Sequence, residues 1–176
     1  MKERYVVDTN VLIAASAANP TAPKDIDATP AEPKQRRRVW QWLHEFEKSP
    51  SKMVLDTANG IYSEYTHKLG FNDYGIQVVM HKWSTNAVDN VEVEYDADGH
   101  GILQPPLLDV IHDLADKKMV AAALDSHEKY GEGCVAFAGD TDWHDWETNL
   151  LANNIQLEPI IEDWSRQKHA EKQTRK

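Results

Sequence analysis

Two aspartates in this sequence follow short apolar runs that are typical of buried strands. Asp8 comes directly after residues 5–7, and Asp140 comes one glycine after residues 134–138. In an open α/β sheet, ligands bind outside the carboxyl ends of the strands, where side chains are held rigidly but still face a crevice. We therefore expect both carboxylates to converge at one edge of a sheet if their strands are neighbours.

Two further acids lie on predicted helices, on or next to the faces that pack against the sheet. Glu64 lies beside the apolar stripe of a helix expected over residues 61–69. Asp116 lies one turn before Met119 and so in line with the apolar stripe that begins there. Asp113, three residues earlier, is the alternative to Asp116. Both helical acids are thus biased toward the sheet, where a solvated charge is not normally placed.

A cluster of carboxylates is a chemical signal because the charges repel one another and burial increases that repulsion. A divalent cation removes the penalty, and Mg²⁺ or Mn²⁺ prefers hard oxygen ligands of this kind. Such a metal can polarise a phosphodiester, activate a water molecule and stabilise the leaving oxygen. Each acid alone has an ordinary interpretation as a strand end, a helix cap or an exposed side chain. Their conjunction favours a metal site.

The elements that must position these acids alternate between strands and helices. Strands are expected at residues 5–7, 53–55, 91–95, 134–138 and 155–157. Apolar spacing and capping residues predict helices that begin near residues 11, 35, 61, 73, 105, 116 and 143. This alternation implies βαβ units, and therefore a three-layer α/β/α fold with a mostly parallel central sheet.

Residues 1–165 form one expected domain, and two segments differ from its regular elements. Residues 19–33 contain four prolines and predict a loop, because proline at that density blocks helix formation and sheet pairing. Residues 166–176 carry five basic residues against the single acid Glu171 and predict a flexible tail. The length of 176 residues suits a single domain.

The composition argues against several classes of protein. Lys and Arg total 19 against 29 Asp and Glu, a net charge of -10, which does not fit a protein that coats DNA or membranes through excess positive charge. No apolar run approaches the roughly 20 residues that span a bilayer. Cys134 is the only cysteine, which excludes a zinc site built from several cysteines. We expect a cytoplasmic protein without membrane contact.

Several stretches of the sequence resemble the PIN-domain ribonuclease family. They are Tyr-Val-Val-Asp-Thr-Asn-Val-Leu-Ile at 5–13, Glu64, the alanine-rich residues 116–124 and Phe-Ala-Gly-Asp-Thr-Asp at 137–142. The resemblance implies a parallel sheet of about five strands and metal-assisted hydrolysis of RNA phosphodiester bonds, with Mg²⁺ or Mn²⁺ as cofactor. The catalytic metal ligands that it implies are Asp8, Glu64, Asp116 and Asp140, with Asp142 as an accessory acid. Thr9 or Asn10 would orient Asp8.

The sequence also departs from the family pattern. Ala138 stands where members often carry Thr or Ser, two residues before the last aspartate, and residues 19–33 and 71–105 resemble insertions relative to compact toxin-type members. The toxin of a toxin–antitoxin pair and a separate RNA-processing enzyme both stay open as biological roles. The expected partners are RNA and, for a toxin, an antitoxin protein, and a homodimer stays open.

A dense basic cluster stands at the start of the second predicted helix. It consists of Lys34, Arg36, Arg37 and Arg38. These side chains could hold an RNA backbone without reading its sequence, or they could form a solvated helix start. Asp142 likewise has the alternative of capping the helix that follows it.

Two other classes of function stay open. A non-catalytic PIN-like module would bind RNA or a protein without cleaving anything. A phosphohydrolase of the haloacid-dehalogenase type also begins from an aspartate after its first strand. That chemistry needs a second acid two residues later, where this sequence has Asn10.

Overall fold

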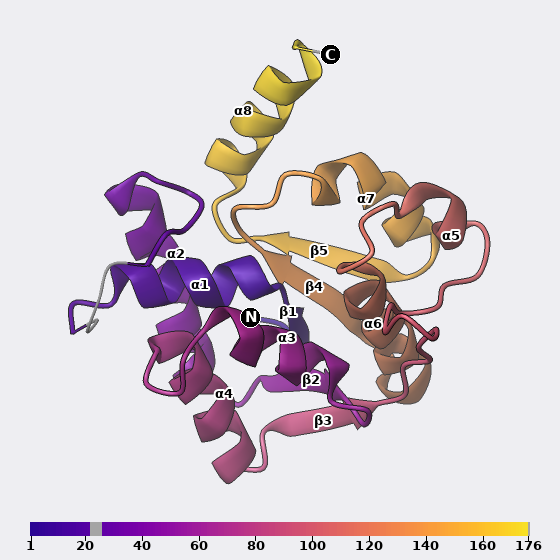
Figure 1. Cartoon of the computed structure of the whole chain (residues 1–176), viewed down its shortest axis with the longest axis horizontal. Helices are drawn as coiled ribbons and strands as arrows, with labels where there is room; N and C mark the ends of the chain where they lie inside the picture. The colour runs from indigo at the N-terminus through magenta and orange to yellow at the C-terminus, as the bar shows by residue number, and fades with distance from the viewer. Residues whose placement is uncertain (22–25, 176) are drawn as a thin grey trace.

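The chain folds into one sheet of five strands with helices on both sides (Figure 1). The computed structural model describes residues 1–21 and 26–175. The strands in this part of the chain are β1 (Arg4–Val7), β2 (Lys52–Asp56), β3 (Val88–Val91), β4 (Gly133–Phe137) and β5 (Ile155–Pro159). Its eight helices are α1 (Thr9–Ala18), α2 (Pro33–Lys48), α3 (Gly60–Lys68), α4 (Tyr74–Ser84), α5 (Leu107–Val110), α6 (Lys117–Tyr130), α7 (Trp143–Ala152) and α8 (Glu162–Gln173).

The strand order is β3-β2-β1-β4-β5, and every described strand pair is parallel. Helices α1 to α4 lie on one face of the sheet, and α6 and α7 lie on the other (Figure 1). The central strands β1 and β4 are buried along almost their whole length, as parallel strands covered on both faces must be. The predicted three-layer α/β/α class with a parallel five-stranded sheet is confirmed.

The pairing of β1 with β4 brings two of the predicted acids to one edge of the sheet. Val7 pairs with Ala136, so the chain leaves β1 at Asp8 on the level at which β4 ends at Phe137. The backbone N–H of Asp8 donates to the Ala136 carbonyl at 2.9 Å. The strand order therefore supplies the neighbouring carboxyl ends that the sequence argument required.

The neighbouring strand β2 ends in Asp56, whose side chain caps the start of helix α3. Both carboxylate oxygens of Asp56 accept backbone N–H groups of the first turn of α3, from Gly60 at 2.9 Å and from Ile61 at 2.8 Å. These bonds satisfy N–H groups that have no partner inside the helix. Asp56 therefore holds the start of α3 against the end of β2.

One predicted strand is displaced along the chain. The alternation over residues 91–95 predicts a strand there, but β3 covers Val88–Val91, and Tyr95 instead forms an isolated antiparallel bridge with Gly101. The hydroxyl of Tyr95 donates to Asp56 at 3.0 Å, and a side chain at Gly60 would collide with the Tyr95 ring. The segment after β3 therefore leaves the sheet and packs over the start of α3.

The segment predicted to be a flexible tail from residue 166 lies largely in a helix, since α8 runs from Glu162 to Gln173. Helix α8 extends away from the layers in Figure 1, yet several side chains tie it to α7. Arg166 pairs with Glu147 at 3.1 Å, His169 contacts Asp145 at 2.7 Å, and Lys172 pairs with Asp142. Such contacts between elements are not visible in the composition of the tail.

The proline-rich loop packs on the molecule in the part that the structure describes. Arg36 on α2 donates to the backbone carbonyls of Ala28 and, at 2.5 Å, of Pro30. A side chain at Gly139 would collide with the backbone of Thr29, so the loop passes directly over the turn that follows β4. Pro23 of the predicted loop lies outside the described residues.

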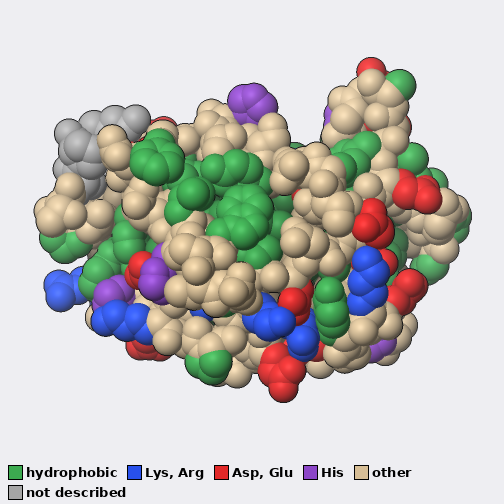
Figure 2. Space-filling model, turned by 90° about the horizontal axis from the view of Figure 1, so that it is seen from below, with side chains coloured by type: hydrophobic (Ala, Val, Ile, Leu, Met, Phe, Trp, Pro, Cys, Tyr) green, Lys and Arg blue, Asp and Glu red, His purple; other side chains and the backbone are tan. Residues whose placement is uncertain are grey.

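The surface seen from below mixes the two signs of charge. Figure 2 shows hydrophobic side chains gathered in the middle of this face, with Lys, Arg, Asp and Glu side chains interspersed along one side. The surplus of acids therefore does not form one continuous acidic surface on this face. Among the described residues, no helix combines the length and the apolar character that crossing a membrane requires.

Candidate metal centre at the carboxyl edge of the sheet

Asp8 is a buried carboxylate whose charge is poorly compensated. The residue is 3% exposed, and its Oδ1 accepts the backbone N–H of Asn10 at 3.3 Å. Its Oδ2 is buried and has no hydrogen-bond partner in the described part of the chain. Burial, followed by the nearby charge of Asp140, raises the pKa of Asp8 to about 7. An oxygen in this condition calls for a cation or a proton.

Asp116 and Asp140 lie close enough to Asp8 for their charges to act on one another. Asp116 precedes the first residue of α6, is 7% exposed, and has its pKa raised to about 9 by burial and then by Asp8 and Asp140. Burial also raises the pKa of Asp140, whose Oδ1 accepts the backbone N–H of Asp142 at 2.8 Å. Three carboxyls from three different elements therefore share one poorly solvated region.

Glu64 lies beside this group but is held by two donors. The hydroxyl of Thr9 donates to its Oε1, and the ammonium of Lys118 lies 2.5 Å from its Oε2. The charge of Glu64 acts on both Asp8 and Asp116. The structure therefore brings all four predicted acids to the same edge of the sheet, with Glu64 engaged by a cation of the chain itself.

The two residues expected to orient Asp8 have different contacts. Asn10 contacts Asp8 through its backbone N–H, while Thr9 bonds to Glu64 and not to the aspartate. Asn10 also lines a cavity of about 140 Å³ together with Ile13 and the loop residues 27–29. The loop over the β4 turn thus forms one wall of a small space beside Asn10.

Asp142 and Asp113 lie at the margin of the group. The carboxylate of Asp142 forms an ion pair with Lys172 of α8, and its side chain is 37% exposed. Asp113 is exposed and accepts the backbone N–H of Ala115 at 2.8 Å, although its charge contributes to the raised pKa of Asp116. Asp116 is therefore the buried acid of the two candidates, and Asp113 lies nearby on the surface.

The basic cluster at the start of α2 divides into engaged and exposed side chains. Arg36 is bonded to the loop carbonyls, and Arg38 donates to Gln35 at 3.1 Å. Lys34 and Arg37 are exposed. Only the exposed pair is presented to a ligand without breaking these contacts, and RNA binding by the four residues stays a prediction.

The carboxylates do not form a closed ligand set. In residues 1–21 and 26–175, the only three acidic or histidine side chains with ligand atoms all within 4.8 Å of one another are Asp96, Asp98 and His100. The two aspartates are exposed, and backbone N–H groups of Asp98 and His100 bond to Asp96 Oδ1, as in an ordinary turn. No three of the acids at the sheet edge have ligand atoms that all lie within this distance of one another.

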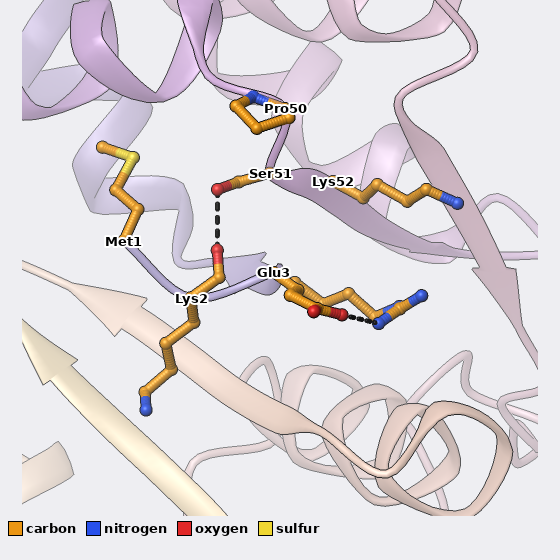
Figure 3. Close-up of a pocket in the computed structure, with 7 residues that line it drawn as sticks. Met1, Lys2, Glu3, Pro50, Ser51 and Lys52 are labelled. Carbon is orange, nitrogen blue, oxygen red and sulfur yellow. Dashed lines mark hydrogen bonds and ion pairs between the residues drawn. The ribbon is translucent and has the colours of Figure 1, made fainter.

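A pocket at the opposite edge of the sheet differs in its charge balance. It encloses about 320 Å³ between residues 1–4 and residues 50–52 (Figure 3). Beside it, the carboxylate of Asp89 lies 2.8 Å from Arg4 Nε and 2.7 Å from Lys52 Nζ. This buried acid is fully compensated by cations of the chain, and it therefore makes no comparable demand for a metal.

Comparisons with known proteins leave the family open, because no protein-family model, curated protein or solved structure matches the chain.

Proposed function

We propose that this protein is a divalent-metal-dependent endoribonuclease that hydrolyses RNA phosphodiester bonds at the carboxyl edge of its sheet. One observation carries the proposal. Asp8 Oδ2 is buried without a partner in the described chain, next to two other carboxyls whose pKa values are raised by burial. Natural proteins do not keep such an arrangement for stability, so it supports a bound cation.

The donor atoms fit a hard divalent cation. The side chains that converge supply carboxylate oxygens and no sulfur or imidazole, which suits Mg²⁺ or Mn²⁺. When bound, the cation would neutralise the carboxylates, activate a water molecule and stabilise the leaving oxygen of the phosphodiester.

The chain's own residues have separate roles in this proposal. Asp8, Asp116 and Asp140 hold the cation, since they are the acids that burial leaves poorly compensated. The Asn10 N–H fixes one oxygen of Asp8 and leaves the other for the metal. Thr9 fixes one oxygen of Glu64 beside these acids, and Glu64 is the fourth ligand in this proposal.

RNA is the substrate class that the resemblance to PIN-domain ribonucleases implies, and one feature of the surface is compatible with it. Lys34 and Arg37 offer exposed positive charge at the start of α2, and phosphate contacts of this kind position a strand without reading its sequence. The proposal includes a cytoplasmic location.

The test is cleavage of a labelled single-stranded RNA of mixed sequence with Mn²⁺, with Mg²⁺ and with a chelator. The wild type should cleave only with metal. Asp8→Asn should lower the rate by at least about 10³-fold, because it removes a ligand on which the reaction depends, while circular dichroism shows an intact fold. Undiminished cleavage by Asp8→Asn would falsify the site assignment. Metal binding without cleavage of any RNA would favour the non-catalytic module.

A further inference from the structure

Lys118 is a buried cation that faces the acidic site from inside the fold. The residue is 8% exposed and lies in the first turn of α6, two positions after Asp116. Its Nζ lies 2.5 Å from Glu64 Oε2 and donates to the Ala115 carbonyl at 3.0 Å. A buried ammonium with two such partners has a defined position, unlike a lysine on a solvated surface.

The surrounding backbone restricts Lys118 to this place. A side chain at Gly101 would collide with the backbone of Lys118, so the segment that follows β3 packs directly onto the first turn of α6. On the other side, Thr9 fixes the second oxygen of Glu64. Both oxygens of this carboxylate are therefore occupied, one by a hydroxyl and one by an ammonium.

Lys118 contacts one acid of the site and does not compensate the others equally. It contacts Glu64, the acid on α3, and not Asp8, whose Oδ2 has no partner in the described chain. For Glu64 to ligate a divalent cation, the ammonium must either move away or share the carboxylate with a second cation. The positive charge of the ammonium also repels a divalent cation bound nearby.

We propose that Lys118 is the resident counter-ion of the site and competes with the divalent cation for Glu64. This inference rests on the proposed metal site. Lys118 stabilises the acidic edge before metal arrives, and it weakens metal binding by occupying a ligand and by adding positive charge. The protein therefore loads its site at a higher metal concentration than the carboxylates alone would require.

The test is calorimetric titration of the metal-depleted protein with Mn²⁺ alone, without RNA. Lys118→Met should bind Mn²⁺ about 10-fold more tightly than the wild type, because it removes the competing charge. The matched control is Lys117→Met, which removes the same charge one residue earlier on the same helix and should change the affinity less than about 2-fold. Unchanged or weaker binding by Lys118→Met overturns the inference.

A measurement on the wild type avoids reliance on a variant that fails to fold. The side-chain NMR signal of the Lys118 ε-methylene group should shift on titration with Mg²⁺, since the ammonium leaves Glu64, whereas the signal of Lys117 should stay. A Lys118 signal that does not move while Mg²⁺ binds overturns the competition. If the wild type binds neither metal, the proposed function fails; if it binds and Lys118 has no effect, only this inference fails.

Discussion

Two aspartates at the ends of adjacent strands show how differently the same residue can be used. Asp56 ends β2 and Asp8 follows β1, and the two are 1% and 3% exposed. The carboxylate of Asp56 accepts the N–H groups of Gly60 and Ile61 and the hydroxyl of Tyr95. Asp8 Oδ1 accepts the backbone N–H of Asn10 at 3.3 Å, and Asp8 Oδ2 has no hydrogen-bond partner in residues 1–21 and 26–175.

The difference in hydrogen bonding separates a carboxylate that stabilises the fold from one that costs stability. A buried carboxylate with three donors stabilises the fold, because every bond to the charged form offsets its desolvation. A buried carboxylate beside other acids costs stability, and it persists only where function requires it. Under the proposed function, Asp8 belongs to the second class together with Asp116 and Asp140, which come from other elements of the fold.

The largest expected effect is an opposite change in stability at the two positions. Without divalent metal at pH 8, Asp56→Asn should lower the free energy of unfolding by about 3 kcal/mol, because an amide nitrogen would face backbone donors. Asp8→Asn should raise it by about 2 kcal/mol, because it removes a buried charge. Denaturant unfolding of both variants measures the two changes.

The contrast between Asp56 and Asp8 is contradicted if the two substitutions change the free energy of unfolding in the same direction. Equal destabilisation would mean that Asp8 is held by bonds as Asp56 is, and that its carboxylate is structural. Added Mn²⁺ should then be tested on the same variants. It should stabilise the wild type and Asp56→Asn, but have much less effect on Asp8→Asn.

The next largest effect is that the contribution of Asp8 to the free energy of unfolding depends on pH. The pKa of Asp8 is raised from its ordinary value to about 7 in the folded protein, so the folded state holds this proton more tightly than the unfolded state. Its contribution is therefore favourable at low pH and is lost as pH rises toward 7. The stabilisation by Asp8→Asn should grow by about 2 kcal/mol between pH 5 and pH 8. A constant difference between variant and wild type over that range would contradict the uncompensated state of Asp8.

A smaller effect on stability should distinguish Arg36, which is bonded to the loop, from the exposed Arg37 on the same helix. Arg36→Ala should lower stability by about 1–2 kcal/mol, because the carbonyls of Ala28 and Pro30 lose their donor. Arg37→Ala should leave stability within about 0.5 kcal/mol, since Arg37 is exposed. RNA affinity, measured by fluorescence anisotropy at low salt, should fall for Arg37→Ala. Equal stability losses in the two variants would remove the distinction between an engaged and an exposed arginine.

The smallest effect concerns the ion pair between Lys172 and Asp142. Both side chains are more than one-third exposed, and exposed pairs contribute little. Lys172→Ala should change stability by less than about 0.5 kcal/mol. A loss of more than about 2 kcal/mol in thermal unfolding would show that α8 is an essential part of the fold.

Much of the fold and the positions of the acids could be predicted because they depend on local pattern. Asp8 and Asp140 follow apolar runs, and Asp116 lies in line with the apolar stripe of its helix, so periodicity alone places them at element ends. The parallel sheet follows from the alternation of strands and helices.

The partners of individual side chains could not be predicted, because they come from distant segments. Lys118 meets Glu64 across 54 residues of sequence, and nothing in its neighbourhood distinguishes it from Lys117. Arg36 donates to a backbone carbonyl of the loop. Because every residue has a backbone carbonyl, the residue types do not show which one Arg36 contacts. Helix α8 was missed because its basic composition suggests a solvated tail, whereas pairing with α7 decides its structure.

The most direct test of the account is calorimetric titration of Mn²⁺ into the wild type, Asp8→Asn and Asp96→Asn. The last variant controls for the exposed turn that contains Asp96, Asp98 and His100. The account predicts binding below about 1 mM in the wild type, a range typical of weakly held hard cations, with Asp96→Asn unchanged and Asp8→Asn at least about 10-fold weaker. No binding by the wild type at millimolar Mn²⁺, or equal binding by Asp8→Asn, would contradict it.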